Sequence, residues 1–212
     1  MRSILGVLNV LGALVAMFAG YYLLPIVTAL LYGETAELQV FAECGSIALV
    51  TGLVVLLATR RHRCELRPRD GYLLVSLSWN AITLLAALPL MLGEPHLSFT
   101  DAVFESMSGL STTGSTIITG LDALPNSVNL WRCALHWLGG MGIIVLAVAI
   151  LPLLGVGGMQ MYRAEAPGPV KDAKLTPRIT ETAKALWLVY AGLTLAASMK
   201  AISTNSIIGE LK

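Results

Sequence analysis

The part of the sequence best suited to chemistry is a run of small, hydroxylated residues around one glycine. The run reads Ser111-Thr112-Thr113-Gly114-Ser115-Thr116-Ile117. A cation stripped of water needs a ring of oxygen atoms, which the backbone carbonyls of such a loop supply and to which hydroxyls add. Glycine permits the positive φ that turns successive carbonyls towards one axis. The residue types therefore favour cation binding, with a Ser/Thr-rich outer turn as the alternative.

The apolar stretch before this run predicts a short helix over residues 101–110. Ser98 followed by Asp101 is a capping-box-like start, weaker than the form with Glu or Gln. Ten residues of helix reach about 15 Å, half of the hydrocarbon thickness of a bilayer, so the chain must turn back. Irregular backbone at membrane depth survives only when it is buried in protein or faces a water-filled cavity. The negative C-terminal end of the helix favours a cation at the loop. We expect a re-entrant pore loop.

The composition indicates an integral membrane protein. Of the 212 residues, 56% are hydrophobic and 13% are charged, against about 45–50% and 25% in soluble domains. These values exclude a water-soluble enzyme, and the scarcity of charge excludes a disordered chain. No Ser–His–Asp, HExxH or SxxK pattern is present, and the cysteines are scattered. The sequence therefore predicts no enzyme, no disulfide framework, no zinc site and no cofactor.

Uncharged runs predict five membrane spans, of which the last is marginal in length. They cover Ile4–Tyr32, Leu38–Thr59, Gly71–Gly93, Cys133–Tyr162 and Ala185–Met199. Eleven of the 14 Lys and Arg precede the first span or lie in the connections after the second and fourth. The positive-inside rule then predicts a multi-pass protein with a cytoplasmic N-terminus.

Several motifs in order along the chain resemble the membrane subunit of the Trk-type potassium-uptake transporters of bacteria, the TrkH/TrkG family. They are residues 111–116, Trp137–Val145, Gly155–Gln160 and Arg163–Pro169, and the likeness covers roughly residues 1–197. The resemblance implies an all-α membrane protein of the bacterial inner membrane, in which four helix–pore loop–helix repeats surround the pore. It implies that Thr112, Thr113, Gly114, Ser115 and Thr116 form the first quarter of a potassium filter, with K⁺ at Thr112, Thr113 and Gly114.

The resemblance also implies an organisation and partners. Residues 1–69 would form an N-terminal transmembrane helix pair with a basic cytoplasmic loop, and 70–160 the first repeat. Residues 161–184 would form a cytoplasmic loop, and 185–212 an incomplete first helix of the second repeat with an atypical tail from Ser198. The expected partners are K⁺, the lipid bilayer, a TrkA-like nucleotide-binding regulatory subunit and, for the full-length family, a second copy, but no nucleic acid. Coupling to H⁺ or Na⁺ is left open.

The length leads to an alternative, because the family subunit is more than twice as long and this chain has one filter loop. One quarter of a filter cannot surround an ion. The alternative is a truncated, transport-incompetent membrane fragment that only assembles with other subunits.

Single residues around the loop have less specific interpretations. Asp101 and Glu105 are expected to cap the short helix and face solvent rather than to attract cations. Arg132 is expected to be an interfacial anchor, and His136 a packed or hydrogen-bonded core residue. The glycines Gly139, Gly140 and Gly142 are expected to allow close helix packing, which includes approach to the pore helix.

Overall fold

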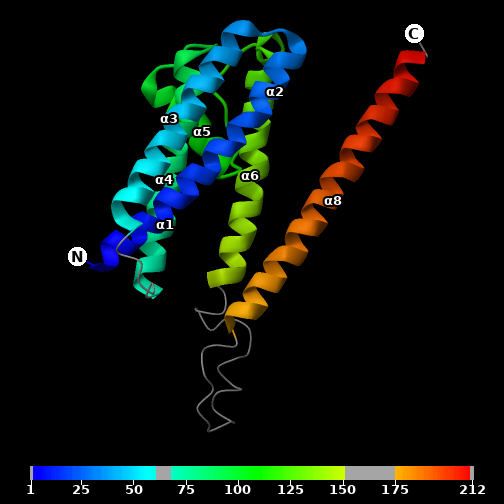
Figure 1. The fold of residues 1–212 in the computed structure, drawn as a ribbon. Coiled ribbons are helices and arrows are strands. Elements are labelled where there is room, and N and C mark those ends of the chain that lie inside the picture. Colours follow the sequence, from blue (N-terminus) through cyan, green and yellow to red (C-terminus); the bar gives the residue numbers. More distant parts are fainter. Residues whose placement is uncertain (1, 61–67, 151–174, 211–212) are drawn as a thin grey trace. The chain divides into compact units, whose positions relative to one another are not determined.

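The fold is all-helical throughout the part of the chain that the computed structural model describes, residues 2–60, 68–150 and 175–210. The chain forms two compact units, Met1–Gly139 and Gly140–Lys212. The helical content of the described residues confirms the predicted all-α class. The helices, labelled in Figure 1, are α1 (Arg2–Ala19), α2 (Leu23–Tyr32), α3 (Thr35–Thr59), α4 (Pro68–Leu92), α5 (Phe99–Leu110), α6 (Asn126–Ile150) and α8 (Leu175–Glu210).

Three helical stretches in the described residues are long and apolar enough to cross a membrane: Ile4–Tyr32, Thr35–Thr59 and Asp70–Leu92. They agree within a few residues with the first three spans predicted from sequence. The first joins α1 and α2 through a 3₁₀ turn at Gly20–Tyr22.

The last two predicted spans agree less closely with the helices of the structure. The fourth was expected over residues 133–162. Its helix, α6, begins earlier, at Asn126, and residues 151–162 of the predicted span lie outside the described part of the chain. The fifth, residues 185–199, lies within α8 but is not among the three apolar stretches. The tail expected to be atypical from Ser198 continues as helix α8 to Glu210. The predicted domain boundaries remain predictions.

Helices α1 and α3 pack closely because glycines stand where their backbones meet. A Cβ atom added to Gly52 would lie 2.5 Å from the backbone nitrogen of Ala16, and one added to Gly12 would lie 2.7 Å from that of Leu56. Small residues permit this approach in membrane helices, where packing rather than the hydrophobic effect holds helices together. A polar contact adds to it, since the Asn9 side-chain amide donates to the Leu56 carbonyl oxygen at 3.1 Å.

An aromatic cluster fixes the start of α6 against the other helices of the first unit. The Trp131 ring is fully buried, with ring centroids of Phe18, Tyr21, Tyr22 and Phe41 at 4.6–6.1 Å. Its indole N–H donates to the carbonyl of Ala86 in α4 at 3.1 Å. Because buried indole N–H groups need an acceptor, this bond sets the orientation of the ring as well as its position.

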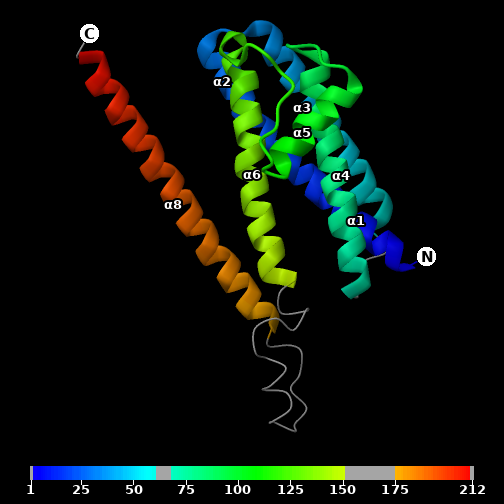
Figure 2. The ribbon, with the colours of Figure 1, turned by 180° about the vertical axis from the view of Figure 1, so that it is seen from behind.

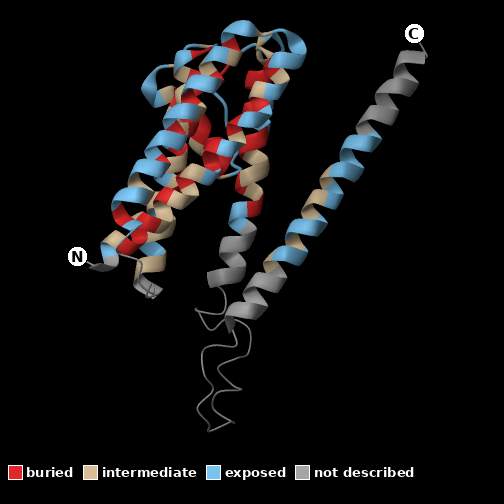
Figure 3. Ribbon diagram, in the orientation of Figure 1, coloured by how far each residue is buried: buried red, intermediate tan, exposed pale blue. Residues whose placement is uncertain are grey.

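The outward faces of the first unit are apolar and exposed. In Figure 3 the buried residues of α1, α3 and α4 gather where these helices meet, and exposed residues cover the other sides. The exposed fractions of Leu31 and Met17 are 79% and 67%. Contiguous exposed apolar surface of this kind suits contact with lipid, as expected for a membrane protein.

The close contact at Gly52 generates a stability prediction. We expect Gly52→Ala to lower the unfolding free energy by about 1–3 kcal/mol, because its methyl group has to push two helix backbones apart. Thermal unfolding of the purified chain in detergent measures the change. Gly20→Ala is the matched control, since a Cβ there meets nothing within 4 Å. Equal melting temperatures for the two variants would contradict the packing argument.

Candidate functional site

Helix α5 is a half-length helix that begins as the sequence predicts. The hydroxyl of Ser98 accepts the Asp101 backbone N–H at 3.3 Å and donates to the Asp101 carboxylate at 2.7 Å. The helix has 12 residues, which span about 18 Å against about 30 Å of hydrocarbon. Figure 2 shows the chain after α5 returning as an irregular stretch to the end at which α6 begins. The expected half-helix and return loop are both present.

Two of three consecutive loop residues have a left-handed backbone conformation, with positive φ. Thr112 has φ +59° and Gly114 has φ +75°. Glycine adopts this conformation without steric cost, whereas for threonine it costs about 1–2 kcal/mol. The C-terminal end of α5 holds the threonine in place, because the backbone N–H groups of Thr112 and Thr113 donate to the Gly109 and Ser108 carbonyls, each at 3.0 Å.

Three successive carbonyl groups form the middle of the loop. Within the described residues, the carbonyl oxygens of Thr112, Thr113 and Gly114 accept no hydrogen bond, whereas that of Ser115 accepts the Ser108 hydroxyl at 2.7 Å. Residues 112–117 are exposed. An open pocket of about 390 Å³ lies beside them, lined by Ser111, Thr113 and Ser115 and by the α5 residues Thr100, Val103, Phe104, Met107 and Ser108. The arrangement can present uncharged oxygen atoms to a cation.

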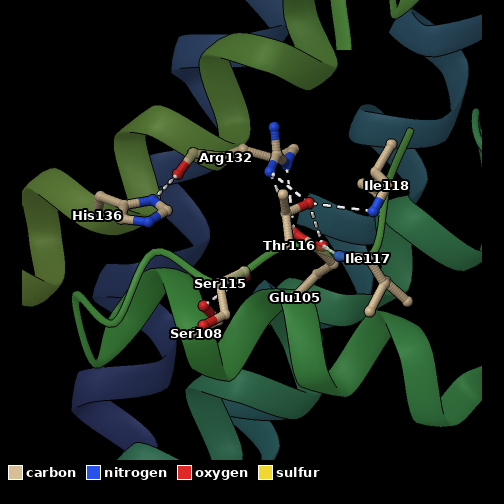
Figure 4. A network of polar contacts seen from close by, with 8 residues as sticks. All are labelled: Glu105, Ser108, Ser115, Thr116, Ile117, Ile118, Arg132 and His136. Carbon is tan, nitrogen blue, oxygen red and sulfur yellow. Dashed lines mark hydrogen bonds and ion pairs between the residues drawn. The ribbon is translucent and has the colours of Figure 1, made fainter. Parts of the chain in front are cut away.

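The buried carboxylate of Glu105 ties the far end of the loop to α5 and α6 (Figure 4). Its Oε1 atom accepts the Thr116 hydroxyl at 2.5 Å and the Ile117 backbone N–H at 2.6 Å. Its Oε2 atom accepts from Arg132 at 3.2 Å. The residue is 5% exposed. The expectation that Glu105 faces solvent is therefore wrong, because its helix turns this position towards the loop.

Arg132 also makes contacts that the sequence did not predict. Its guanidinium donates to Glu105 and, at 3.1 Å, to the Thr116 hydroxyl, and its side chain is 14% exposed. It is thus part of the loop support, whereas its place at the membrane interface remains a prediction. The half-buried His136, one turn later, donates from Nδ1 to the Arg132 carbonyl oxygen at 2.9 Å, so the expected hydrogen bond of this histidine is present.

Gly139 lets α6 approach the end of α5. A Cβ atom there would lie 1.9 Å from the Leu110 carbonyl oxygen, a distance that no side chain could accommodate. Gly109 on α5 fits against Leu135 in the same way, with 3.1 Å between an added Cβ and the leucine Cβ. The predicted glycine contact with the pore helix is therefore seen at Gly139.

Glu34, in the short connection between α2 and α3, caps the N-terminus of α6. Its carboxylate accepts the backbone N–H groups of Asn126 at 2.7 Å and Ser127 at 3.1 Å, and the Ser127 hydroxyl at 2.5 Å. Burial by itself would raise the pKa of Glu34, but the hydrogen bonds from Ser127 and Asn126 outweigh it and hold the pKa below its ordinary value of 4.5. A carboxylate at a helix N-terminus also interacts favourably with the helix dipole.

The family model described as "TrkH: Cation transport protein" matches residues 37–205. The chain belongs to this family. Helix α5, the glycine-centred loop and the first half of α6 all lie within the matched range. The resemblance drawn from the sequence motifs is thereby confirmed.

Relatives within the TrkH family are similar over almost the whole of this chain. The Trk system potassium uptake protein TrkH of Halomonas elongata is 54% identical over 194 residues, and that of Escherichia coli K12 is 50% identical over 192. The potassium uptake protein TrkG of E. coli K12 is 41% identical over 191. These alignments take in 91%, 90% and 90% of this chain, but only 40%, 40% and 39% of the relatives. The chain thus spans about 40% of their length.

A solved structure supports the same assignment. The crystal structure of the potassium transporter TrkH from Vibrio parahaemolyticus matches with a TM-score of 0.76 and 44% identity, over 91% of this chain and 38% of that one. The names of all these relatives describe transport and not catalysis, in agreement with the absence of an enzyme motif from the sequence.

The structure keeps the five residues of the predicted filter in one loop, but their binding of K⁺ remains a prediction. Sequence reasoning missed the supports around them, namely Glu105, Arg132 and Glu34. One signal was available for the ion pair: residues 94–130 contain no Lys or Arg, so Arg132 is the first basic residue after the acidic outer segment. Nothing local marked Glu34 as a cap, because its partners lie over 90 residues away.

The Glu34 cap generates a pH prediction. Because its pKa is lowered in the folded chain, Glu34 contributes stability above about pH 4.5 that is lost as the pH falls through the lowered value. We expect Glu34→Gln to lower the melting temperature at pH 7, and the difference from the unmodified chain to shrink below pH 4.5. Asp122→Asn, which removes an exposed carboxylate, is the control. A difference that is constant from pH 7 to pH 3.5 would refute this role.

Proposed function

We propose that this chain contributes to potassium uptake across the bacterial inner membrane as part of a Trk-type cation transporter. The observation that carries the proposal is the loop: left-handed backbone at Thr112 and Gly114, with three carbonyl groups that accept no hydrogen bond from the described residues. The names of the relatives, potassium uptake proteins, support K⁺ as the ion.

In this proposal the carbonyls of Thr112, Thr113 and Gly114 replace water around K⁺, with Ser115 and Thr116 completing the first quarter of the filter. Selectivity by carbonyl oxygens needs a ring of them held at suitable distances and field strength. The carboxyl end of α5 adds a negative potential at the loop, because its last carbonyl groups point there. The coordinating oxygen atoms carry no formal charge. They therefore suit a monovalent cation, which must be bound weakly enough to leave the filter again.

The remaining features of the proposal follow from charge and from the family. The positive-inside rule, applied to the basic connections, supports a cytoplasmic N-terminus. In the cytoplasm the segment 161–184 would meet a TrkA-like nucleotide-binding regulatory subunit, and the full-length protein would assemble as a homodimer. H⁺ or Na⁺ would be the coupling ion if transport is a symport.

The second candidate is a membrane component that assembles with other subunits and does not transport by itself. It is favoured by the single filter loop in this sequence and the roughly 40% of the relatives' length that the chain spans. Expression of the chain alone in cells that lack potassium uptake separates the two. Growth at low K⁺ would overturn the second candidate.

A hybrid tests the filter whichever candidate holds. In it, this chain replaces the matched 194 residues of the Halomonas elongata relative. Failure of the hybrid to take up K⁺, although it is present in the membrane, would count against the proposed function.

Gly114 is the sharpest point at which to test the filter. We expect Gly114→Ala in the transporting form to reduce K⁺ uptake at least tenfold, because the strain of about 1–3 kcal/mol is released by moving the filter carbonyls. Measured uptake of ⁸⁶Rb⁺ or K⁺ gives the result.

Gly120→Ala is the matched control for this substitution. Gly120 also has a positive φ, +73°, and a Cβ there meets nothing within 4 Å, so it carries the same backbone strain outside the filter. Equal uptake by the two variants would show that the loop at Gly114 has no special role.

A further inference from the structure

The connection between loop and helices at Glu105 has more contacts than a cap or a surface ion pair requires. The carboxylate accepts from the Thr116 hydroxyl, the Ile117 backbone N–H and the Arg132 guanidinium, while it is 5% exposed. A buried carboxylate is costly unless donors surround it. Here the donors come from two places, the irregular loop and α6, so the carboxylate joins elements that share no backbone hydrogen-bond ladder.

The last filter residue and the two residues after it are attached to this group, Thr116 and Ile117 directly and Ile118 through Thr116. Thr116 donates to Glu105, accepts from Arg132 at 3.1 Å, and accepts the Ile118 backbone N–H at 3.1 Å. Figure 4 shows Thr116 and Arg132 beside each other next to the Glu105 carboxylate, with the backbone nitrogen of Ile117 also near it. Residues 116–118 are therefore fixed to α5 through a single side chain.

The other end of the filter is fixed to the same helix. The backbone N–H groups of Thr112 and Thr113 bind the last turn of α5, and the Ser108 hydroxyl binds the Ser115 carbonyl. The carbonyls of residues 112–114 are thus held between two anchors only a few residues apart. Discrimination between K⁺ and Na⁺ depends on where such carbonyls sit and how far they can move. The second anchor consequently bears on selectivity.

Glu105 also compensates a charge that would oppose cation binding. Arg132 lies within hydrogen-bond distance of Thr116, at the end of the filter segment. An unpaired guanidinium there would repel a cation, and the effect is strong where water is scarce. The ion pair at 3.2 Å keeps the arginine as a hydrogen-bond donor to the loop while its charge is balanced.

We propose that Glu105 is a positioning residue that, paired with Arg132, sets the ion selectivity of the loop by anchoring Thr116 and Ile117. This inference rests on the proposed function and extends it, since neither residue offers an atom to the ion. Truncation of the carboxylate frees the loop end and leaves Arg132 unbalanced. We expect the filter then to discriminate poorly between K⁺ and Na⁺ while it still conducts both ions.

The test uses the hybrid described above, which contains the full chain, with K⁺ uptake measured against increasing Na⁺. We expect Glu105→Ala to reduce the K⁺/Na⁺ discrimination at least tenfold, because tenfold corresponds to the loss of about one buried hydrogen bond and this variant loses several. Glu105→Gln, whose amide oxygen still accepts the Ile117 N–H, is expected to retain more of the discrimination. Asp101→Asn is the matched control, because Asp101 is one turn earlier on α5 and its carboxylate contacts Ser98, not the loop. Unchanged discrimination in Glu105→Ala overturns the proposal.

Two further measurements keep the outcome decisive. If Glu105→Ala is not recovered from the membrane, Thr116→Val replaces it, since this change removes the hydroxyl contact and leaves the Ile117 bond. Unchanged discrimination in that variant also overturns the proposal. If the hybrid with the unmodified chain takes up no ion, the proposed function fails, and hydrogen exchange at the Ile117 amide decides the anchoring. Faster exchange in Glu105→Ala than in Asp101→Asn supports it, and equal exchange overturns it.

Discussion

Backbone that leaves a regular helix inside a membrane protein has to find its hydrogen-bond partners within the protein. The loop after α5 does so at its start through the last carbonyls of α5 and at its far end through Glu105. The carboxylate binds the hydroxyl of Thr116 and the N–H of Ile117, neither of which belongs to a helix. Arg132 then makes the burial of that carboxylate tolerable. The shape of the loop thus depends on a side chain of α5 and a side chain of α6 being held at a fixed separation.

The position of α6 is in turn set by parts of the chain far from the loop. Trp131, next to Arg132, lies among the rings of Phe18, Tyr22 and Phe41, and its N–H binds Ala86. Glu34 holds the first N–H groups of α6. Because α1 and α3 meet at glycines, the aromatic rings they carry have defined places. The N-terminal helices therefore act as the support on which the loop is built, which gives them a physical role besides spanning the bilayer.

Most of the fold could be predicted from the sequence because its signals are local. Long uncharged runs predicted the first three apolar helices within a few residues, since crossing a bilayer fixes both length and composition. Ser98 and Asp101 predicted where α5 begins, and Gly114 predicted a left-handed backbone, which the structure has. The family assignment was likewise available, because the order of several short motifs is more specific than any one of them.

The amino-acid sequence by itself determined the helical class, the half-length helix and the loop that follows it, since each depends on residues that are neighbours in the chain. Only the tertiary structure decided that Glu105 is buried and paired with Arg132, that Glu34 caps α6 and that Gly139 touches the end of α5. The physical reason is that these contacts join residues 27 to 93 positions apart. The free energy of a charged or polar side chain is set by its spatial neighbours, which no local pattern of residue types specifies.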